Sequence, residues 1–247
     1  MKKSIVFIVV ILLVFSCKNE EKLTAQDIVD KAIEVAGGET YKGSEISFDF
    51  RGRTYTSKRE AKGTKLIRLT IDSTGKRTKD ILAPTYFKRM VNDSVVQVPD
   101  SMITRYSNSV NSVHYFAYLP QGLNDKAVNK ELLEDVNINE VPYYKLRISF
   151  DQEGGGTDFE DIFVYWINKN SFKIDYLAYE FHVDGGGVRM REAYNERYVN
   201  GLRFVDYKNY KPAESSVKVE EIDEALKNDG LKLLSKIELE NISVKLN

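Results

Sequence analysis

The sequence has one cysteine, one tryptophan and two histidines among its 247 residues, and little excess of either charge. A lone cysteine, Cys17, excludes an internal disulfide and a metal site built from several thiolates. The histidines, His114 and His182, lie far apart and show neither the His-x-Glu nor the His-x-x-x-His spacing typical of zinc sites. The formal net charge of −1 argues against binding to a phosphate backbone. We therefore predict no cofactor, no metal and no nucleic-acid partner.

A long hydrophobic run is also missing. The longest, Ile5 to Phe15, is shorter than the about 20 apolar residues that span a bilayer. It follows Lys2-Lys3 and leads into Val14-Phe15-Ser16-Cys17, the order of an export signal. This tetrapeptide resembles the lipobox of bacterial lipoproteins. The resemblance implies that residues 1–16 are a signal peptide, that Cys17 carries a lipid which anchors the protein to a membrane, and that residues 17–23 are a charged tether.

The residues after Cys17 bear on location. Bacteroidota lipoproteins sent to the cell surface carry a lysine and acidic residues just after the cysteine, and Lys18 with Glu20-Glu21 resembles that pattern, with Asn19 between them. The sequence therefore predicts an outer-membrane lipoprotein of the cell envelope, and it leaves the periplasmic and the surface side both open.

Three segments have the pattern of helices. Thr24 is a predicted N-cap before an apolar stripe that ends at Gly37-Gly38. A second helix is expected from Asp100, as its cap, to Ala117, before Pro120 and Gly122. A short third helix is expected over 222–228.

The remaining periodicity is that of strands. Alternation of apolar and polar residues predicts about eleven of them, over 46–51, 67–71, 78–82, 86–91, 94–98, 144–150, 162–167, 172–183, 188–199, 202–204 and 233–246. Asn200-Gly201 is a strong hairpin signal. Ile162 to Ile167 is apolar at both phases, so we expect cover on both faces. A change of phase in the last segment predicts a β-bulge near Glu240-Asn241.

These elements predict a single mainly β (α+β) domain over residues 24–247, with a strongly curved antiparallel sheet or half-barrel. A helix that ends in Gly-Gly before a long meander with a mid-chain helix resembles the lipoprotein-carrier (LolA-like) fold. The chain also resembles uncharacterised lipoproteins of Bacteroidota, over Lys31-Ala32-Ile33 to Gly37-Gly38, Ile46-Ser47-Phe48-Asp49-Phe50-Arg51, Tyr115-Phe116-Ala117-Tyr118-Leu119-Pro120 and Asn200-Gly201-Leu202-Arg203-Phe204. The resemblance implies helices that cap the concave face over a hydrophobic cavity, in which carriers of this fold shield acyl chains.

The candidate ligand-binding residues are aromatic or apolar and lie where a lid helix would end over the sheet: Tyr115, Phe116, Tyr118, Leu119 and Trp166. Amphipathic rings suit the mouth of a pocket. The alternative for the same residues is packing in a dry core. No catalytic residue is predicted, since there is no Gly-x-Ser-x-Gly elbow and the only thiol is expected to be lipidated.

Two charged groups have competing interpretations. The acidic residues around the first triple glycine, Asp151, Glu153, Asp158, Glu160 and Asp161, differ in spacing from an EF-hand and predict a solvated hairpin. Arg189, Arg191 and Arg197 alternate along one strand, where they either pair with carboxylates of neighbouring strands or bind an anionic head group.

The function that these patterns favour is a non-enzymatic, membrane-anchored lipoprotein that binds a hydrophobic, lipid-like ligand or a partner lipoprotein. Two alternatives stay open. One is a structural or interaction module of the envelope, and the other is an envelope hydrolase that uses His114 or His182.

Overall fold

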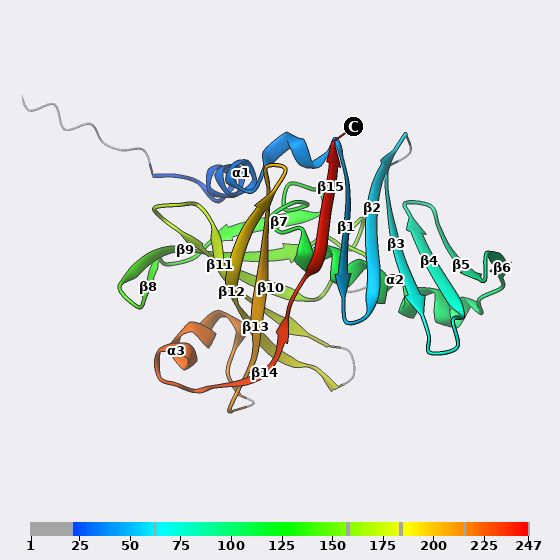
Figure 1. Ribbon diagram of the computed structural model, residues 1–247. Helices are drawn as coiled ribbons and strands as arrows, with labels where there is room; N and C mark the ends of the chain where they lie inside the picture. The colour runs from blue at the N-terminus through cyan, green and yellow to red at the C-terminus, as the bar shows by residue number, and fades with distance from the viewer. Residues whose placement is uncertain (1–21, 62, 157–158, 183–184, 215, 247) are drawn as a thin grey trace, which may run out of the picture.

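The structure is a computed structural model that describes residues 22–61, 63–156, 159–182, 185–214 and 216–246. The predicted signal peptide, Cys17 and the tether up to residue 21 lie outside the described residues. Within them the chain forms fifteen strands in two antiparallel sheets, with three α-helices (Figure 1). The mainly β class with curved antiparallel sheets is confirmed. The strands divide into two sheets and exceed the predicted number by four. Part of this excess arises because polar strands such as β2 (Arg53–Glu60) and β8 (Val136–Ile138) carry little apolar alternation.

The first sheet has seven strands in the order β15-β1-β2-β3-β4-β5-β6. Most neighbours are consecutive in sequence, so this sheet is a meander closed at one edge by the last strand of the chain. The strands are β1 (Ser44–Phe50), β2 (Arg53–Glu60), β3 (Gly63–Ile71), β4 (Arg77–Ala83), β5 (Tyr86–Val91), β6 (Ser94–Val96) and β15 (Glu240–Leu246).

The second sheet has eight strands, in the order β14-β13-β12-β11-β10-β9-β7 with β8 paired to β9. Asn200 and Gly201 both have positive φ and join β12 to β13, so the predicted hairpin is confirmed. The strands are β7 (Val128–Leu132), β8 (Val136–Ile138), β9 (Val141–Phe150), β10 (Ile162–Asn168), β11 (Ile174–Phe181), β12 (Gly187–Val199), β13 (Leu202–Pro212) and β14 (Leu231–Ile237).

The first helix, α1 (Ala25–Val35), begins as predicted. The Thr24 hydroxyl accepts from the amide of Asp27 at 3.1 Å, and the Asp27 carboxylate accepts from the amide of Thr24 at 2.8 Å. This capping box satisfies amides that the first turn leaves free. The helix buries Ile28, Val29 and Ala32 against the core.

The second helix, α2 (Asp100–Ala117), starts one residue before the predicted position. Pro99 rather than Asp100 is the cap residue, where a missing N–H removes no helical hydrogen bond, and Asp100 stands in the first turn. The short α3 (Ile222–Lys227) follows the 3-10 turn η3 (Val219–Glu221). Among the described residues, no helix combines the length and the apolar character needed to cross a bilayer.

Strand β10 is covered on both faces, as predicted. Tyr165 and Ile167 belong to the larger hydrophobic cluster, which α1, α2 and the inner faces of both sheets share. Val164 and Trp166 point to the other face, into a second cluster. That cluster is closed by Val219 and Ile222, so the cover on this face comes from η3 and α3. Figure 1 shows α3 on the outer side of the second sheet.

A buried ion pair fixes α3 to the second sheet. Lys145 Nζ in β9 lies 2.7 Å from Asp223 Oδ1 in α3 and 5.5 Å from the centroid of the Trp166 ring. Asp223 is 1% exposed. Replacing either partner by an uncharged residue would lower the stability of the fold, because the remaining charge would stay buried without a counter-charge.

The last strand segment is divided between the sheets. β14 pairs with β13 of the second sheet, and β15 pairs with β1 of the first. The register between β1 and β15 shifts where Ser47 faces Ser243 and Asp49 faces Glu240, and Asn241 has positive φ. The predicted bulge near Glu240-Asn241 is therefore confirmed. The change of phase before it arises because the chain crosses from one sheet to the other.

Candidate functional site

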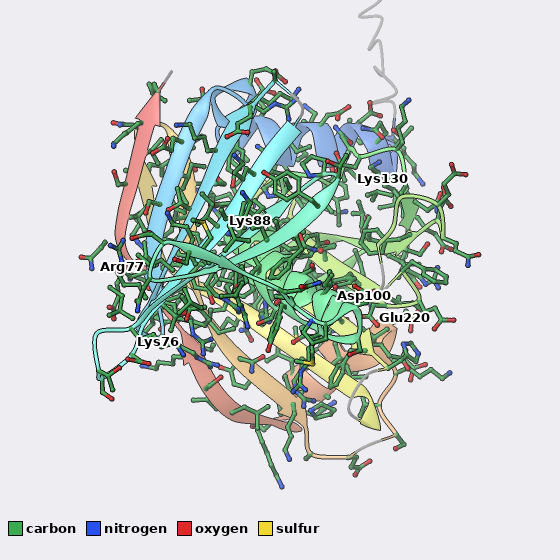
Figure 2. All side chains as sticks on the ribbon, turned by 90° about the vertical axis from the view of Figure 1, so that its right-hand side faces the viewer. Lys76, Arg77, Lys88, Asp100, Lys130 and Glu220 are labelled. Carbon is green, nitrogen blue, oxygen red and sulfur yellow. The ribbon has the colours of Figure 1, made fainter. Side chains whose placement is uncertain are left out.

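Helix α2 is held by hydrogen bonds to both sheets. Towards the first sheet, His114 Nε2 lies 3.3 Å from the carbonyl oxygen of Ile67 in β3. Towards the second, Tyr115 Oη lies 2.7 Å from Tyr165 Oη in β10. Figure 2 shows α2 (green) between the first sheet (blue to cyan) and strands of the second (yellow to orange), with its first residue, Asp100, labelled. A cavity lies on each side of the helix, one towards each sheet.

The space towards the second sheet is a cavity of about 230 Å³, which we call the aromatic cavity. Its strand wall is a series of contacting rings: the Phe150 and Phe163 centroids are 5.8 Å apart, and those of Phe163 and Tyr179 are 5.6 Å apart. An aromatic wall of this kind suits an apolar chain. The lining residues are Asn108, Asn111, Ser112, Tyr115, Phe116, Leu119, Phe150, Gly155, Asp161, Phe163, Leu177, Tyr179 and Arg191.

In the first triple glycine, Gly154-Gly155-Gly156, close packing requires a glycine at position 155. A Cβ at this position would lie 2.2 Å from the carbonyl oxygen of Asp151 and 2.9 Å from the Cβ of Phe150. Backbone is therefore packed against the end of β9 at a distance that only glycine allows. The sequence predicts a turn here, and the structure adds that Gly155 lines the aromatic cavity.

The space towards the first sheet is a cavity of about 360 Å³, which we call the polar cavity. Two buried polar atoms at it, Tyr41 Oη and Gln121 Nε2, have no hydrogen-bond partner in the structure. Its lining carries charged and polar side chains and suits an apolar chain less well: Tyr41, Lys42, Ser44, Ser57, Arg59, Thr64, Leu66, Asn111, His114, Tyr115, Tyr118, Gln121, Gly122 and Asp125.

Tyr115 lines both cavities and forms part of the partition between them. Burial raises the pKa of its phenol, so the hydroxyl is neutral at physiological pH. A neutral hydroxyl bonded to Tyr165 is compatible with an apolar chain beside it. Asn111 of α2 also lines both cavities, so the partition includes Tyr115 and Asn111.

The structure brings four of the five candidate residues together around the end of α2. Tyr115, Phe116 and Leu119 line the aromatic cavity, and Tyr118 lines the polar cavity. All four also belong to the larger hydrophobic cluster or pack against it, so packing and cavity lining are combined in the same side chains.

Trp166 does not join them. It is fully buried in the second cluster, on the opposite face of the second sheet. The physical reason is the two-residue period of a strand: Phe163 and Tyr165 face α2, so Trp166 faces α3. Trp166 therefore lies outside the aromatic cavity, and its role in ligand binding stays a prediction.

His114 is a buried core histidine. Its Nδ1 lies 3.2 Å from Tyr118 Oη, and the neutral tautomer that donates from Nε2 to the Ile67 carbonyl satisfies both ring nitrogens. Burial lowers the pKa of His114 to about 4, although the hydrogen bond to the Ile67 carbonyl acts in the opposite direction. The side chain is thus neutral near pH 7 and is 1% exposed.

The depressed pKa of His114 predicts acid sensitivity. An unfolded histidine titrates near 6.5, so between about pH 6.5 and 4 the unfolded chain binds more protons than the folded one. The stabilising effect of the neutral ring is complete above pH 6.5 and is lost as the pH falls towards 4, by about 3 kcal/mol. We expect His114→Gln to flatten this part of the profile, measured by urea denaturation at pH 7, 5.5 and 4. Equal profiles for His114→Gln and the wild type would contradict the prediction.

His182 lies in a different environment. Its side chain is 54% exposed, and its Nδ1 is 3.4 Å from Asp161 Oδ1. The two histidines therefore do not form a common site in the structure. Asp158 of the acidic group lies outside the described residues. Across the described part of the chain, no group of three or more His, Cys, Asp or Glu side chains could hold a metal ion.

The three alternating arginines have different partners. Arg197 Nη2 lies 2.8 Å from Asp206 Oδ1, as expected for a cross-strand pair. Arg189 Nη1 donates instead to the carbonyl of Val188, and Arg191 lines the aromatic cavity. The bulge of β12 between Tyr194 and Arg197 changes the phase, which is why Arg197 does not share the face of Arg191.

Sequence reasoning missed several lining residues. Phe150, Phe163, Leu177 and Tyr179 all lie on predicted strands, and their phase marks them as facing one side of the sheet. The missing information was which face α2 covers. Only contacts between distant segments, such as that of Tyr115 with Tyr165, determine this.

Similarity to known proteins agrees with this architecture. One protein family model matches residues 2–241. The chain belongs to DUF6503. This is a family of unknown function. The comparison with curated proteins finds no match to this DUF6503 chain.

Two solved structures are similar to the DUF6503 chain. A DUF1329 family protein from Desulfovibrio piger superposes with a TM-score of 0.50 and 12% sequence identity, over 88% of this chain and 92% of that one. A LolA superfamily protein from Nitrosomonas europaea gives a TM-score of 0.47 and 14% identity, over 92% and 94% of the chains. The first similarity shows a shared fold.

Proposed function

We propose that this protein is a non-enzymatic lipoprotein of the cell envelope that binds a lipid-like ligand, or the acyl chain of a partner lipoprotein, in the aromatic cavity. The observation that carries the proposal is the cavity itself: α2 lies over contacting rings of the second sheet and leaves a space between them. A concave space lined by aromatic side chains with a few polar groups is typical of small-molecule sites.

The volume restricts the ligand. Pockets for drug-sized ligands measure about 300 to 1,000 Å³, and the aromatic cavity has about 230 Å³. It therefore accommodates one chain of modest length rather than several acyl chains.

The location follows from the N-terminal pattern. A signal peptide over residues 1–16 and a lipid on Cys17 would tether residues 24–247, as one domain, to an outer membrane on its periplasmic or surface side. An anchored protein captures or holds its ligand at the membrane rather than carrying it between membranes.

The absence of catalysis is part of the proposal. His114 is buried with both ring nitrogens in hydrogen bonds, and neither histidine lines the aromatic cavity. The hydroxyls at that cavity belong to Ser112, Tyr115 and Tyr179, and none of them has a histidine partner in the structure. These residues suit binding rather than bond cleavage.

A variant that fills the cavity tests the proposal. Ser112 is an exposed residue of α2 that lines the aromatic cavity, so Ser112→Trp is expected to place an indole in it without disturbing the core. We expect the affinity for a medium-chain fatty-acid probe to fall at least about tenfold, which corresponds to about 1.4 kcal/mol. The measurement is isothermal titration calorimetry on the mature chain with Cys17→Ser.

The matched control is Ser101→Trp, at an exposed position of the same helix that lines neither cavity. It is expected to bind the probe like the wild type, and both variants should keep the wild-type melting temperature within a few degrees. Equal probe affinity in the Ser112 variant and the wild type would exclude the aromatic cavity as the site.

A further inference from the structure

Arg191 is an arginine built into the wall of the aromatic cavity. It stands on β12 opposite Leu177 of β11, and both residues line the cavity. The carbon atom of its guanidinium group lies 4.6 Å from the ring centroid of Phe116 on α2 and 5.1 Å from that of Tyr179 on β11. The cation is thus held between an aromatic ring of the helix and one of the sheet.

The charge of Arg191 has no carboxylate partner within ion-pair distance among the described residues. Arg197 on the same strand pairs with Asp206, and Arg203 on β13 pairs with Glu196. Within the described part of the chain, Arg191 makes one side-chain hydrogen bond, from Nη2 to Tyr179 Oη at 3.3 Å, and its buried Nε has no partner there. Buried donors are rarely left unpaired, since the cost of removing them from water is not recovered.

The contacts leave one kind of partner open to this cation. Because aromatic rings cover the guanidinium, new hydrogen bonds form at its edge, in the plane where a carboxylate binds with two parallel bonds. Rings around the group also reduce screening by water, which strengthens an ion pair. Asp161 also lines the cavity, but it forms no ion pair with Arg191 among the described residues. Its Oδ1 lies 3.4 Å from His182 Nδ1 instead.

We infer that the ligand is a single-chain amphiphile with a carboxylate head group, that Arg191 binds the head group, and that the chain lies along Phe163 and Phe150. This inference rests on the proposed function, since it specifies the ligand of the same cavity. One cation without a carboxylate partner matches one negative charge, and the volume of about 230 Å³ matches one chain.

The test compares two probes that share a chain and differ in charge. Decanoate and decanol are titrated into the mature chain with Cys17→Ser, below their aggregation limits, by isothermal titration calorimetry. The wild type is expected to bind decanoate at least tenfold more tightly than decanol. Arg191→Met keeps an unbranched side chain between the rings and removes the charge, so it is expected to abolish this preference while decanol affinity stays within about twofold.

The matched control is Arg189→Met, two residues away on the same strand and outside the cavity lining, which is expected to keep the preference. Equal binding of decanoate and decanol by the wild type would overturn the head-group assignment and leave the proposed function in place. No binding of either probe would overturn both. The wild-type ratio needs no variant, so a misfolded Arg191→Met protein would not prevent a decision.

Discussion

Replacing Asp80 by alanine is expected to lower the free energy of unfolding by about 3 to 5 kcal/mol. Asp80, in β4, is 2% exposed and accepts hydrogen bonds from two arginines. Arg68 Nη2 lies 2.7 Å from Oδ2, and Arg89 Nε lies 2.6 Å from Oδ1. Without the carboxylate, both guanidinium groups would keep a buried or partly buried position without a counter-charge. Arg68 also donates to Ser109 of α2 at 2.6 Å, so the loss would loosen α2 from the first sheet.

Urea denaturation followed by the fluorescence of the single tryptophan measures this effect. The control is Glu60→Ala, which removes a carboxylate from an exposed pair with Lys65 and should change the free energy of unfolding by less than about 1 kcal/mol. Equal losses in the two variants would show that the arginines find other partners.

The same carboxylate predicts a pH dependence. Burial raises the pKa of Asp80, but the hydrogen bonds from Arg89 and Arg68 outweigh it, so the pKa lies below the ordinary value of 3.8. The stabilising effect is therefore present above pH 3.8 and is lost as the pH falls through the lower value of the folded state. The difference between wild type and Asp80→Ala should narrow in that acidic range.

How far the sequence determines the fold depends on whether the deciding contacts are local. Thr24 and Asp27 cap α1 through atoms three residues apart, and Asn200-Gly201 forms its turn from its own backbone preferences, so both features were predictable. Strand β2 was missed because Tyr55 is its only buried large apolar residue. Its pairing with β1 and β3 decides its conformation, and that pairing is not visible in its own pattern.

The division into two sheets illustrates the same limit. Alternation along the last segment shows a change of phase, which the bulge at Asn241 explains in part. That β14 and β15 belong to different sheets follows from their partners, β13 and β1, which lie far away in the sequence. A local pattern contains no information about which distant strand is the partner.

For the site, residues on α2 were predictable and residues on the sheet were not. The segment from Tyr115 to Leu119 was chosen because it lies where the helix ends over the sheet, and the structure places Tyr115, Phe116, Tyr118 and Leu119 at the two cavities. In β10, both phases are apolar, so the period of two identifies two faces without saying which one meets α2. The same ambiguity concealed Arg191, whose alternation with Arg189 is typical of an outer face.

Trp166→Ala is expected to lower stability without changing ligand affinity, because Trp166 and the aromatic cavity lie on opposite faces of the second sheet. Trp166 is fully buried among Val164, Val219 and Ile222, and truncation of a buried tryptophan costs about 3 to 5 kcal/mol. Since the lost volume lies under α3, away from the aromatic cavity, decanoate affinity should stay within about twofold of wild type. Stability is measured by circular dichroism, because the variant lacks the fluorescent side chain, and affinity by calorimetry at a temperature where the variant is folded.

Leu177→Ala is the matched comparison, since Leu177 is 1% exposed on the neighbouring strand and lines the aromatic cavity. Its truncation is expected to cost about 2 to 5 kcal/mol and also to change decanoate affinity, because the enlarged cavity loses contacts with the chain. A tenfold loss of affinity in Trp166→Ala with none in Leu177→Ala would put the ligand between β10 and α3. The ligand chain would then contact Trp166 rather than Phe163, as the sequence analysis predicted for Trp166.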